Sequence, residues 1–416
     1  MKRLTSFLAC FVLTVSTVVG LTACGGNKDT VVIWAAEEEK ALMETLVSEF
    51  KTSNPDVKED ITVEVQSVWN AQSVVAKDPE AAADVILIPH DQVGLMAKQG
   101  LLAEIRDGTA ATFATDIKTL NAPATVQQVT YDDKIYGFPL TMDTYVLYYD
   151  KTIFTDENTV KSVDAMLTSS MPNIPDSTEK ATPFGYRIED GFYLSMGFFA
   201  MGCTLYGENG DNPAACNWNN ADGLKFMQYA ATNFRQKGKK FKSGDVKDLA
   251  INVLNHRQGA CISGGWEKQD TFKNADHIGY TTLPSITIDG EQKELKSFSN
   301  SKLYAVNNRS QYKGTASRLA AFVTSETSQL RFASERGYYP TNLNAQANEV
   351  VTGNPFFQVI RKQLENSIPV PVIPEISRYW EPAKSLGTSL YNGSLKGDDV
   401  SLQAALDTFV QSLRQD

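Results

Sequence analysis

Strands and helices alternate through the N-terminal part of this chain, and this alternation restricts the fold more than any other feature. Apolar runs at residues 31–34, 61–65 and 85–88 have the length of strands, and the run at 85–88 is continuous, as in a strand buried on both faces. Residues 42–50 and 71–75 place apolar side chains at helical spacing. Three successive strand–helix units predict a parallel or mixed sheet of the α/β class.

The third predicted strand is followed directly by His90 and Asp91, and then by a short helix that Gly100 closes. Ligands of open α/β sheets bind in the crevice beyond the carboxyl ends of the strands. Asp91 is therefore a candidate ligand contact. An Asp at this place is equally typical of a residue that caps the following helix, which begins near Gln92. Both interpretations stay open at the level of the local sequence.

The N-terminus indicates export. The chain of 416 residues is too long for one ordinary hydrophobic core, so we expect two lobes after the N-terminal signal. A basic head, the apolar stretch 4–19 and small residues before Cys24 form the pattern of a secretory signal, and Leu-Thr-Ala-Cys is similar to a bacterial lipobox. We predict that residues 1–23 are a lipoprotein signal peptide and that 24–30 form a tether with lipid on Cys24. An ordinary signal peptide with an incidental cysteine is the alternative.

Charge and cysteine content restrict the partners. A formal net charge of −10 gives no support to a nucleic acid or an anionic lipid as partner. Cys203 and Cys216 bracket a loop rich in Gly and Asn, so a disulfide between them is plausible in an exported protein, whereas Cys261 reads as a buried free thiol. The three histidines share no metal-ligand spacing with these cysteines, and no nucleotide-binding glycine motif occurs. Neither a metal nor a cofactor is predicted.

Two extended runs, 134–140 and 144–150, are separated by the polar joint Thr141-Met142-Asp143. A long strand pair with such a joint suits a crossing between two lobes. Further along, the apolar run 260–262 leads through a Gly turn to Trp266, which stands at the mouth of that strand.

In order and spacing, several segments of the chain resemble the maltose/maltodextrin-binding proteins, the extracellular solute-binding subunits of sugar ABC transporters. The resemblance covers the chain from Val31 to its C-terminus with gaps. The segments that carry it are Val31–Trp34, His90-Asp91, Gln99–Ile105, Tyr136–Pro139 with Asp150-Lys151, Ile262–Trp266, Thr282–Pro284 and Tyr379-Trp380.

This resemblance implies a two-lobed α/β fold of the periplasmic-binding-protein type, with a ligand cleft between lobes joined by a multi-crossing hinge. Lobe 1 would comprise residues 31–142 and 303–347, and lobe 2 residues 146–300 and 352–416. The family's ligand contacts would fall on two acidic residues, on two stacking tryptophans and on four neighbouring positions: Asp91, Asp143, Trp266, Trp380, Glu37 or Glu38, Phe192 and Tyr379.

The chain departs from the family pattern near this expected site. Ile88 replaces a Trp in the strand before His-Asp, and Gln92 replaces a basic residue. In the second lobe the match is loose around Glu189, and Asp190-Gly191 differs from the family's residues. One stacking surface and one charged donor are thereby lost, so sugar binding is expected but maltose itself is left open.

The expected residues suit a neutral oligosaccharide, because aromatic rings cover apolar sugar faces and ionised carboxylates accept bonds from hydroxyl groups. The resemblance implies a monomer, anchored at the extracellular face of the cell membrane, that delivers a maltodextrin-like oligosaccharide to an ABC permease. A different sugar or sugar derivative, or a glycan-binding sensor or adhesin, are the alternatives. An enzyme is not expected, since a glycosidase needs two carboxylates at fixed separation and no acid or nucleophile signature surrounds Asp91 and Asp143.

Overall fold

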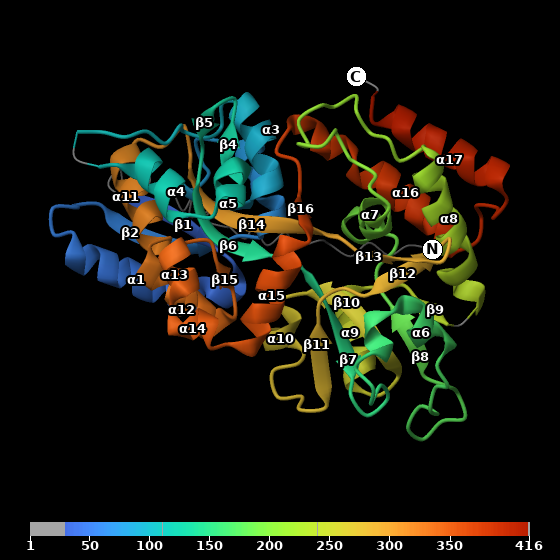
Figure 1. Ribbon diagram of the computed structural model, residues 1–416. Coiled ribbons are helices and arrows are strands. Elements are labelled where there is room, and N and C mark those ends of the chain that lie inside the picture. Colours follow the sequence, from blue (N-terminus) through green and yellow to red (C-terminus); the bar gives the residue numbers. More distant parts are fainter. Residues whose placement is uncertain (1–29, 110, 239, 415–416) are drawn as a thin grey trace, which may run out of the picture.

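The protein has two lobes, each built around its own β-sheet (Figure 1). A computed structural model describes residues 30–109, 111–238 and 240–414. The predicted signal peptide, the lipidated Cys24 and the tether up to residue 29 lie outside this part of the chain, and Thr30 already belongs to the first strand.

The first lobe contains a seven-stranded mixed sheet in the order β15-β6-β14-β3-β1-β2, with β16 beside β14. β1 pairs in parallel with β2 and β3, whereas β14 is antiparallel to β3 and β6. The predicted α/β class is thus confirmed. The strands are β1 (Thr30–Ala35), β2 (Asp60–Val65), β3 (Val85–Pro89), β6 (Phe138–Asp143), β14 (Ser297–Val306), β15 (Tyr339–Pro340) and β16 (Ser367–Pro369).

Helices cover this sheet, and α1 shows why: its large apolar side chains repeat every three to four residues and become buried. The helices and the hairpin of the first lobe are α1 (Lys40–Ser53), α2 (Ala71–Lys77), α3 (Val93–Lys98), α4 (Phe113–Leu120), α5 (Pro123–Gln128), α11 (Lys313–Val323), α12 (Glu326–Arg336), β4 (Thr130–Tyr131) and β5 (Lys134–Ile135). Three short 3-10 helices, η1 (Glu37–Glu39), η2 (Val68–Asn70) and η3 (His90–Gln92), follow β1, β2 and β3.

The second lobe contains a five-stranded sheet in the order β11-β7-β10-β8-β9 and a separate hairpin. Its strands are β7 (Tyr145–Asp150), β8 (Thr182–Gly185), β9 (Phe241–Lys242), β10 (Gln258–Gly264), β11 (Ile278–Thr281), β12 (Ser285–Ile288) and β13 (Glu291–Glu294). Its helices are η4 (Thr159–Lys161), α6 (Val163–Thr168), α7 (Gly191–Ala200), α8 (Ala221–Asn233), η5 (Gln236–Gly238), α9 (Val246–Leu254), α10 (Glu267–Asp270), η6 (Pro374–Arg378), α16 (Trp380–Tyr391) and α17 (Asp399–Ser412).

The chain passes between the lobes where β6 becomes β7, and again along β14, which runs across the middle of the molecule (Figure 1). Thr144 joins β6 to β7, and its buried hydroxyl lies 2.6 Å from the Ser297 hydroxyl at the start of β14. These two crossings are therefore bonded to each other. After β15 the chain returns through α13 (Leu343–Ala347), α14 (Glu349–Thr352) and α15 (Pro355–Glu365).

Three clusters of buried apolar side chains hold this arrangement. One lies in the first lobe, one fills the second, and a third joins α9 and one face of β7 and β10 to α15. Ala333 and Tyr339 belong to this third cluster, so the region from α12 to α15 packs against both lobes. We retain the predicted lobe boundaries as a proposal, with this region as the part that joins them.

The proposed disulfide is not formed. Cys203, Cys216 and Cys261 are buried free thiols, as was expected for Cys261 alone. The Cys203 thiol instead faces the side-chain oxygen of Asn220, 3.6 Å away. Burial raises the pKa of the Cys203 thiol to about 12 and that of Cys216 to about 11, which keeps both in the unreactive protonated form.

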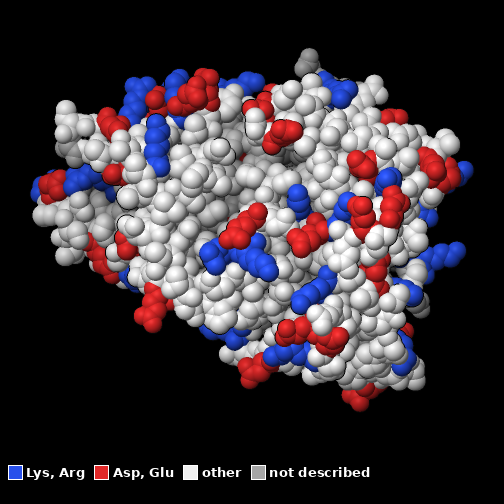
Figure 2. Space-filling model, viewed as in Figure 1, with Lys and Arg blue, Asp and Glu red and all other residues white. Residues whose placement is uncertain are grey.

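The surface in Figure 2 has acidic and basic side chains interspersed, without a large area of one sign on this face. Within the described residues, every helix falls short of the length and apolarity that crossing a membrane requires.

Candidate functional site

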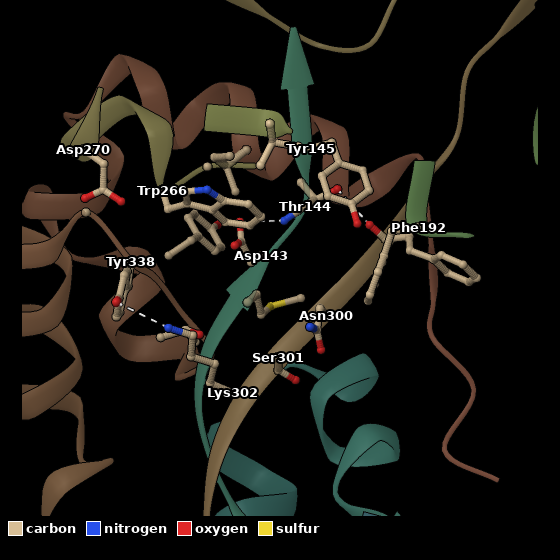
Figure 3. A pocket seen from close by; sticks show the side chains of 18 of the residues that line it. Asp143, Thr144, Tyr145, Phe192, Trp266, Asp270, Asn300, Ser301, Lys302 and Tyr338 are labelled. Carbon is tan, nitrogen blue, oxygen red and sulfur yellow. Dashed lines mark hydrogen bonds between the residues drawn. The ribbon is translucent and has the colours of Figure 1, made fainter. Parts of the chain in front are cut away.

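A cavity of about 530 Å³ lies between the two lobes, which is within the usual range for a small-molecule site. Both lobes line it, and both crossing strands pass through its floor (Figure 3). The lining residues include Glu38, Trp69, Thr141, Met142, Asp143, Tyr145, Arg187, Asp190, Phe192, Tyr193, Trp266, Asp270, Phe298, Asn300, Ser301, Lys302, Arg336, Tyr338, Phe356 and Ile360.

Asp143 is the last residue of β6 and lies where the chain leaves the first lobe. Its Oδ1 atom accepts a hydrogen bond of 2.8 Å from the backbone N–H of Thr144. Burial raises the pKa of this carboxyl to about 6, although the N–H groups of Thr144 and Gly265 and the charge of Lys302 act to lower it. The site thus holds a fixed carboxylate that is poorly solvated, as an acceptor for ligand hydroxyl groups must be.

Trp266 lies beside Asp143 in the cavity, after the turn that ends β10 (Figure 3). Gly264 makes this position possible, because a Cβ atom there would lie 2.0 Å from the indole ring. Gly265 likewise lets the backbone approach Asp143, since its Cβ would lie 2.9 Å from Oδ1. The two glycines therefore bring a large ring and a carboxylate side by side.

The second lobe adds a wall of rings. Tyr145 stacks on Tyr193 with centroids 4.4 Å apart, and Phe192 meets the edge of Tyr145 at 6.2 Å. Behind this wall, Trp380 stacks on Phe192 at 4.7 Å. The predicted Phe192 lines the cavity, whereas Trp380, which packs against the Phe192 ring, is not among the described residues that line it.

Tyr379 requires a correction. This side chain is fully buried in the core of the second lobe, and its hydroxyl donates a hydrogen bond of 2.7 Å to the carbonyl oxygen of Gly191. A ligand in the cavity cannot reach it. Tyr379 matches the family in its position along the chain, but its side chain is buried and does not reach the cavity.

Asp91 and Glu37 are not among the described residues that line the cavity, whereas Glu38 is. The Asp91 side chain caps neither η3 nor α3, so the capping interpretation is wrong. Its Oδ1 atom is enclosed without a hydrogen-bond partner among the described residues. Burial raises the pKa of this carboxyl to about 6. Oδ1 of Asp91 is therefore an unsatisfied acceptor among the described residues, and the role of Asp91 as a ligand contact stays a prediction.

Comparison with known proteins identifies the family. Residues 45–358, more than half of the chain, match the family model described as bacterial extracellular solute-binding protein. The chain belongs to this family. It is a family of solute-binding proteins and not of enzymes.

Two curated relatives from Bacillus subtilis (strain 168) match nearly the full length of this solute-binding protein. The maltodextrin-binding protein MdxE is 24% identical over 415 residues, which cover 95% of each chain. A galactooligosaccharide-binding protein is 25% identical over 426 residues, or 97% of this chain and 96% of that one. Among solved structures, the unliganded maltodextrin-binding protein MalE1 from L. casei BL23 superimposes with a TM-score of 0.81 at 23% identity, covering 93% of this chain and 99% of the other.

The structure adds cleft residues of this solute-binding protein that the sequence interpretation missed. In the first lobe, Lys302 forms an ion pair of 3.3 Å with the fully buried Glu39, and the Tyr338 hydroxyl donates to the same carboxylate at 2.9 Å. Burial lowers the pKa of Lys302, but Glu39, Tyr338 and Glu38 together outweigh this and hold the pKa above its ordinary value. No local pattern links these three residues, which lie in three distant segments.

Trp69 was missed as well, although a signal for it existed. It lies in η2, directly beyond the carboxyl end of β2, and the rule that selected Asp91 after β3 selects it too. Trp69 lines the cavity while 63% exposed, and its carbonyl oxygen accepts a bond from Gln92. An indole with that exposure is an available surface at the mouth of the cleft.

Proposed function

We propose that this solute-binding protein captures a neutral oligosaccharide, most nearly a maltodextrin, in the cleft between its lobes and delivers it to an ABC permease. The observation that carries the proposal is that the Asp143 carboxylate and the Trp266 ring lie side by side in a cavity lined by both lobes. A sugar ring offers one apolar face and a rim of hydroxyl donors, and this pair matches both.

The cavity volume and its position support the same proposal. About 530 Å³ is room for a short oligosaccharide and not for a macromolecule. Because the lining comes from both lobes, a ligand bound to one lobe gains further contacts when the other lobe closes on it. The ligand therefore favours the closed arrangement by the free energy of those added contacts. The closed form is then the one that a permease would recognise.

The two curated relatives also support an oligosaccharide, since both are named for binding one. They differ in the sugar, and this chain lacks the family's Trp and basic residue at Ile88 and Gln92. The segment from His90-Asp91 to Ile105 resembles the maltodextrin-binding members, so we propose a sugar of the maltodextrin class. Calorimetric titration with sugars of both classes distinguishes the two.

Isothermal titration calorimetry with maltose, maltotriose, a galactooligosaccharide and cellobiose tests the proposal, with an amino acid as the non-sugar control. We expect the tightest binding for the maltodextrins and a loss of at least tenfold in Asp143→Asn, because a charge-assisted bond contributes about 1.5–3 kcal/mol. Binding of the galactooligosaccharide alone would correct the sugar class. Absence of heat with every saccharide would overturn the proposal.

Delivery and anchoring need cellular tests. We propose that lipid on Cys24 holds the protein, as a monomer, at the extracellular face of the membrane; the lipobox pattern supports this. Cys24→Ser should release the protein into the medium and abolish labelling with palmitate. Deleting the gene should abolish uptake of the bound sugar. If uptake is unchanged in the deletion strain although the purified protein binds the sugar, the protein is instead a glycan-binding sensor or adhesin.

A further inference from the structure

A cluster of ligating side chains lies outside the cleft, at the far end of the second lobe. Asp150 ends β7, His256 follows α9, and His277 precedes β11, and one donor atom of each lies within 4.8 Å of the others. Since β7 begins at the cleft with Tyr145, its six residues place the cluster roughly 17 Å away from the cavity. The spacing of histidines and cysteines in the sequence gave no sign of it.

His256 occupies a backbone position that favours glycine. The N–H of Arg257 bonds to the carbonyl of Asn252 at 2.8 Å and that of His256 to Val253 at 3.2 Å, which is the Schellman pattern at the end of α9. His256 has a φ of 57°, in the left-handed region, where a side chain costs about 1 kcal/mol relative to glycine. The chain therefore carries an imidazole here at the expense of stability.

Among the described residues, each of the two imidazoles has one nitrogen with a hydrogen-bond partner and one without. Nδ1 of His256 lies 2.5 Å from Oδ2 of the fully buried Asp150, whose Oδ1 is held by the N–H and hydroxyl of Thr152. Nε2 of His277 lies 3.1 Å from the carbonyl oxygen of Leu254. A carbonyl only accepts, so His277 carries its proton on Nε2, and neutral His256 carries its proton on Nδ1 facing the carboxylate.

The remaining nitrogens, Nε2 of His256 and Nδ1 of His277, then hold lone pairs. Metal-ligating histidines show this arrangement, with the second ring nitrogen donating to a carboxylate or a backbone carbonyl. The two rings are neighbours, with centroids 4.8 Å apart, and the His256 side chain is 41% exposed. The C-terminus of α9 adds a negative partial charge beside them, which favours a cation.

We propose that His256 and His277 bind a divalent first-row transition metal ion such as Zn²⁺, with Asp150 orienting His256 and water completing the coordination. Two imidazoles select such an ion over Mg²⁺ or Ca²⁺, which prefer oxygen ligands. The ion would connect the ends of α9 and β7 with the start of β11. Its role would be to stabilise the second lobe, independently of the sugar.

Zn²⁺ titration of the purified protein without a polyhistidine tag tests the proposal, read by calorimetry and by the thermal unfolding midpoint. We expect one ion per chain and a midpoint that rises with Zn²⁺ concentration, because an ion that binds only the folded state stabilises it. Mg²⁺ should do neither. His90 cannot contribute, because it is buried and both of its ring nitrogens are engaged.

His256→Gly is the decisive variant. Glycine relieves the left-handed position, but loss of the imidazole leaves Oδ2 of the buried Asp150 without its partner, so we expect a folded variant of lower stability that loses Zn²⁺ affinity by tenfold or more. His277→Gln keeps a donor for the Leu254 carbonyl and should lose affinity likewise. Both should bind sugar as the wild type does. Stoichiometric Zn²⁺ binding that survives His256→Gly, or is absent from the wild type, would overturn the proposal.

Discussion

The two walls of the cleft are held in place by different forces. In the first lobe, a buried ion pair between Glu39 and Lys302 fixes the wall, and the Tyr338 ring lies under the ammonium group at 4.6 Å. In the second lobe, rings hold each other: Tyr145 stacks on Tyr193, and Phe192 on Trp380. The position of the first-lobe wall depends on one ion pair, whereas that of the second-lobe wall depends on several ring contacts.

This difference has consequences for mutation. Removing one partner of a buried ion pair leaves the other charge without compensation, so the loss is concentrated in one residue. Ring packing is non-directional and adapts to a ring of similar size, so its loss is graded. We therefore expect the charged wall to determine stability and the aromatic wall to determine affinity.

Lys302→Met should give the largest effect, a loss of about 3–5 kcal/mol in the free energy of unfolding, since it leaves the Glu39 carboxylate buried and unpaired. Urea denaturation measures it. Lys293→Met is the matched control, because its ion pair with Glu291 is largely exposed and should contribute at most about 1 kcal/mol. Equal losses in the two variants would contradict the role given to the Glu39–Lys302 pair.

Trp266→Ala should weaken sugar binding by about 2–3 kcal/mol, or roughly 30- to 150-fold, because a ring that covers a sugar face is removed. Calorimetry measures the loss. Trp380→Phe keeps a ring behind Phe192 and should change affinity less than threefold. If Trp380→Phe weakens binding as much as Trp266→Ala, then Trp380 is itself a ligand contact, as the family resemblance implied.

Between the walls, Asp143 should make affinity depend on pH. The ionised carboxylate accepts bonds from sugar hydroxyls, so affinity should fall as the pH drops through about 6, by up to tenfold per unit. Stability should move the opposite way. The pKa of this Asp is higher in the folded state than in the unfolded chain, so folding is favoured by protonation between about pH 6 and 4.

Calorimetry and urea denaturation from pH 7.5 to 5 measure the two trends. Asp143→Asn should remove the affinity trend and only the part of the stability trend that comes from this carboxyl. Asp91 also has a pKa raised to about 6, so Asp91→Asn is the matched control. If the pH dependence of affinity disappears in Asp91→Asn and persists in Asp143→Asn, then Asp91 and not Asp143 is the carboxylate that binds the sugar.

The alternation of strands and helices was enough to predict the sheet of the first lobe, because burial on both faces shows directly in a run such as 85–88. Asp143 and Trp266 were expected at the cleft from the family resemblance, and both lie at or just beyond the end of a strand, which is a local property of the sequence. Tyr379 and Trp380 could not be separated by sequence, since both are aromatic neighbours and only packing decides which of them a ligand can approach.

The Glu39–Lys302–Tyr338 group lay beyond sequence reasoning for a different reason. Its members are separated by 263 and 36 residues, and their contact depends on β14 lying beside β3 and β6. The same holds for His256 and His277. Long-range polar contacts follow from topology, and spacing along the chain carries no information about them.

Trp69 is the exception in the charged wall, because it is an aromatic ring of the first lobe at the mouth of the cleft. We expect Trp69→Ala to weaken binding of maltotetraose by about 1 kcal/mol, or roughly fivefold, through loss of one stacking surface. Maltose should bind the variant as well as the wild type, since two sugar rings seated at Asp143 and Trp266 do not extend to the mouth. Calorimetry with both sugars measures the difference, and Val65→Ala, another exposed apolar side chain of the first lobe, is the control. A loss that is equal for the two sugars would place Trp69 at the centre of the site, and the division into a charged and an aromatic wall would then be wrong.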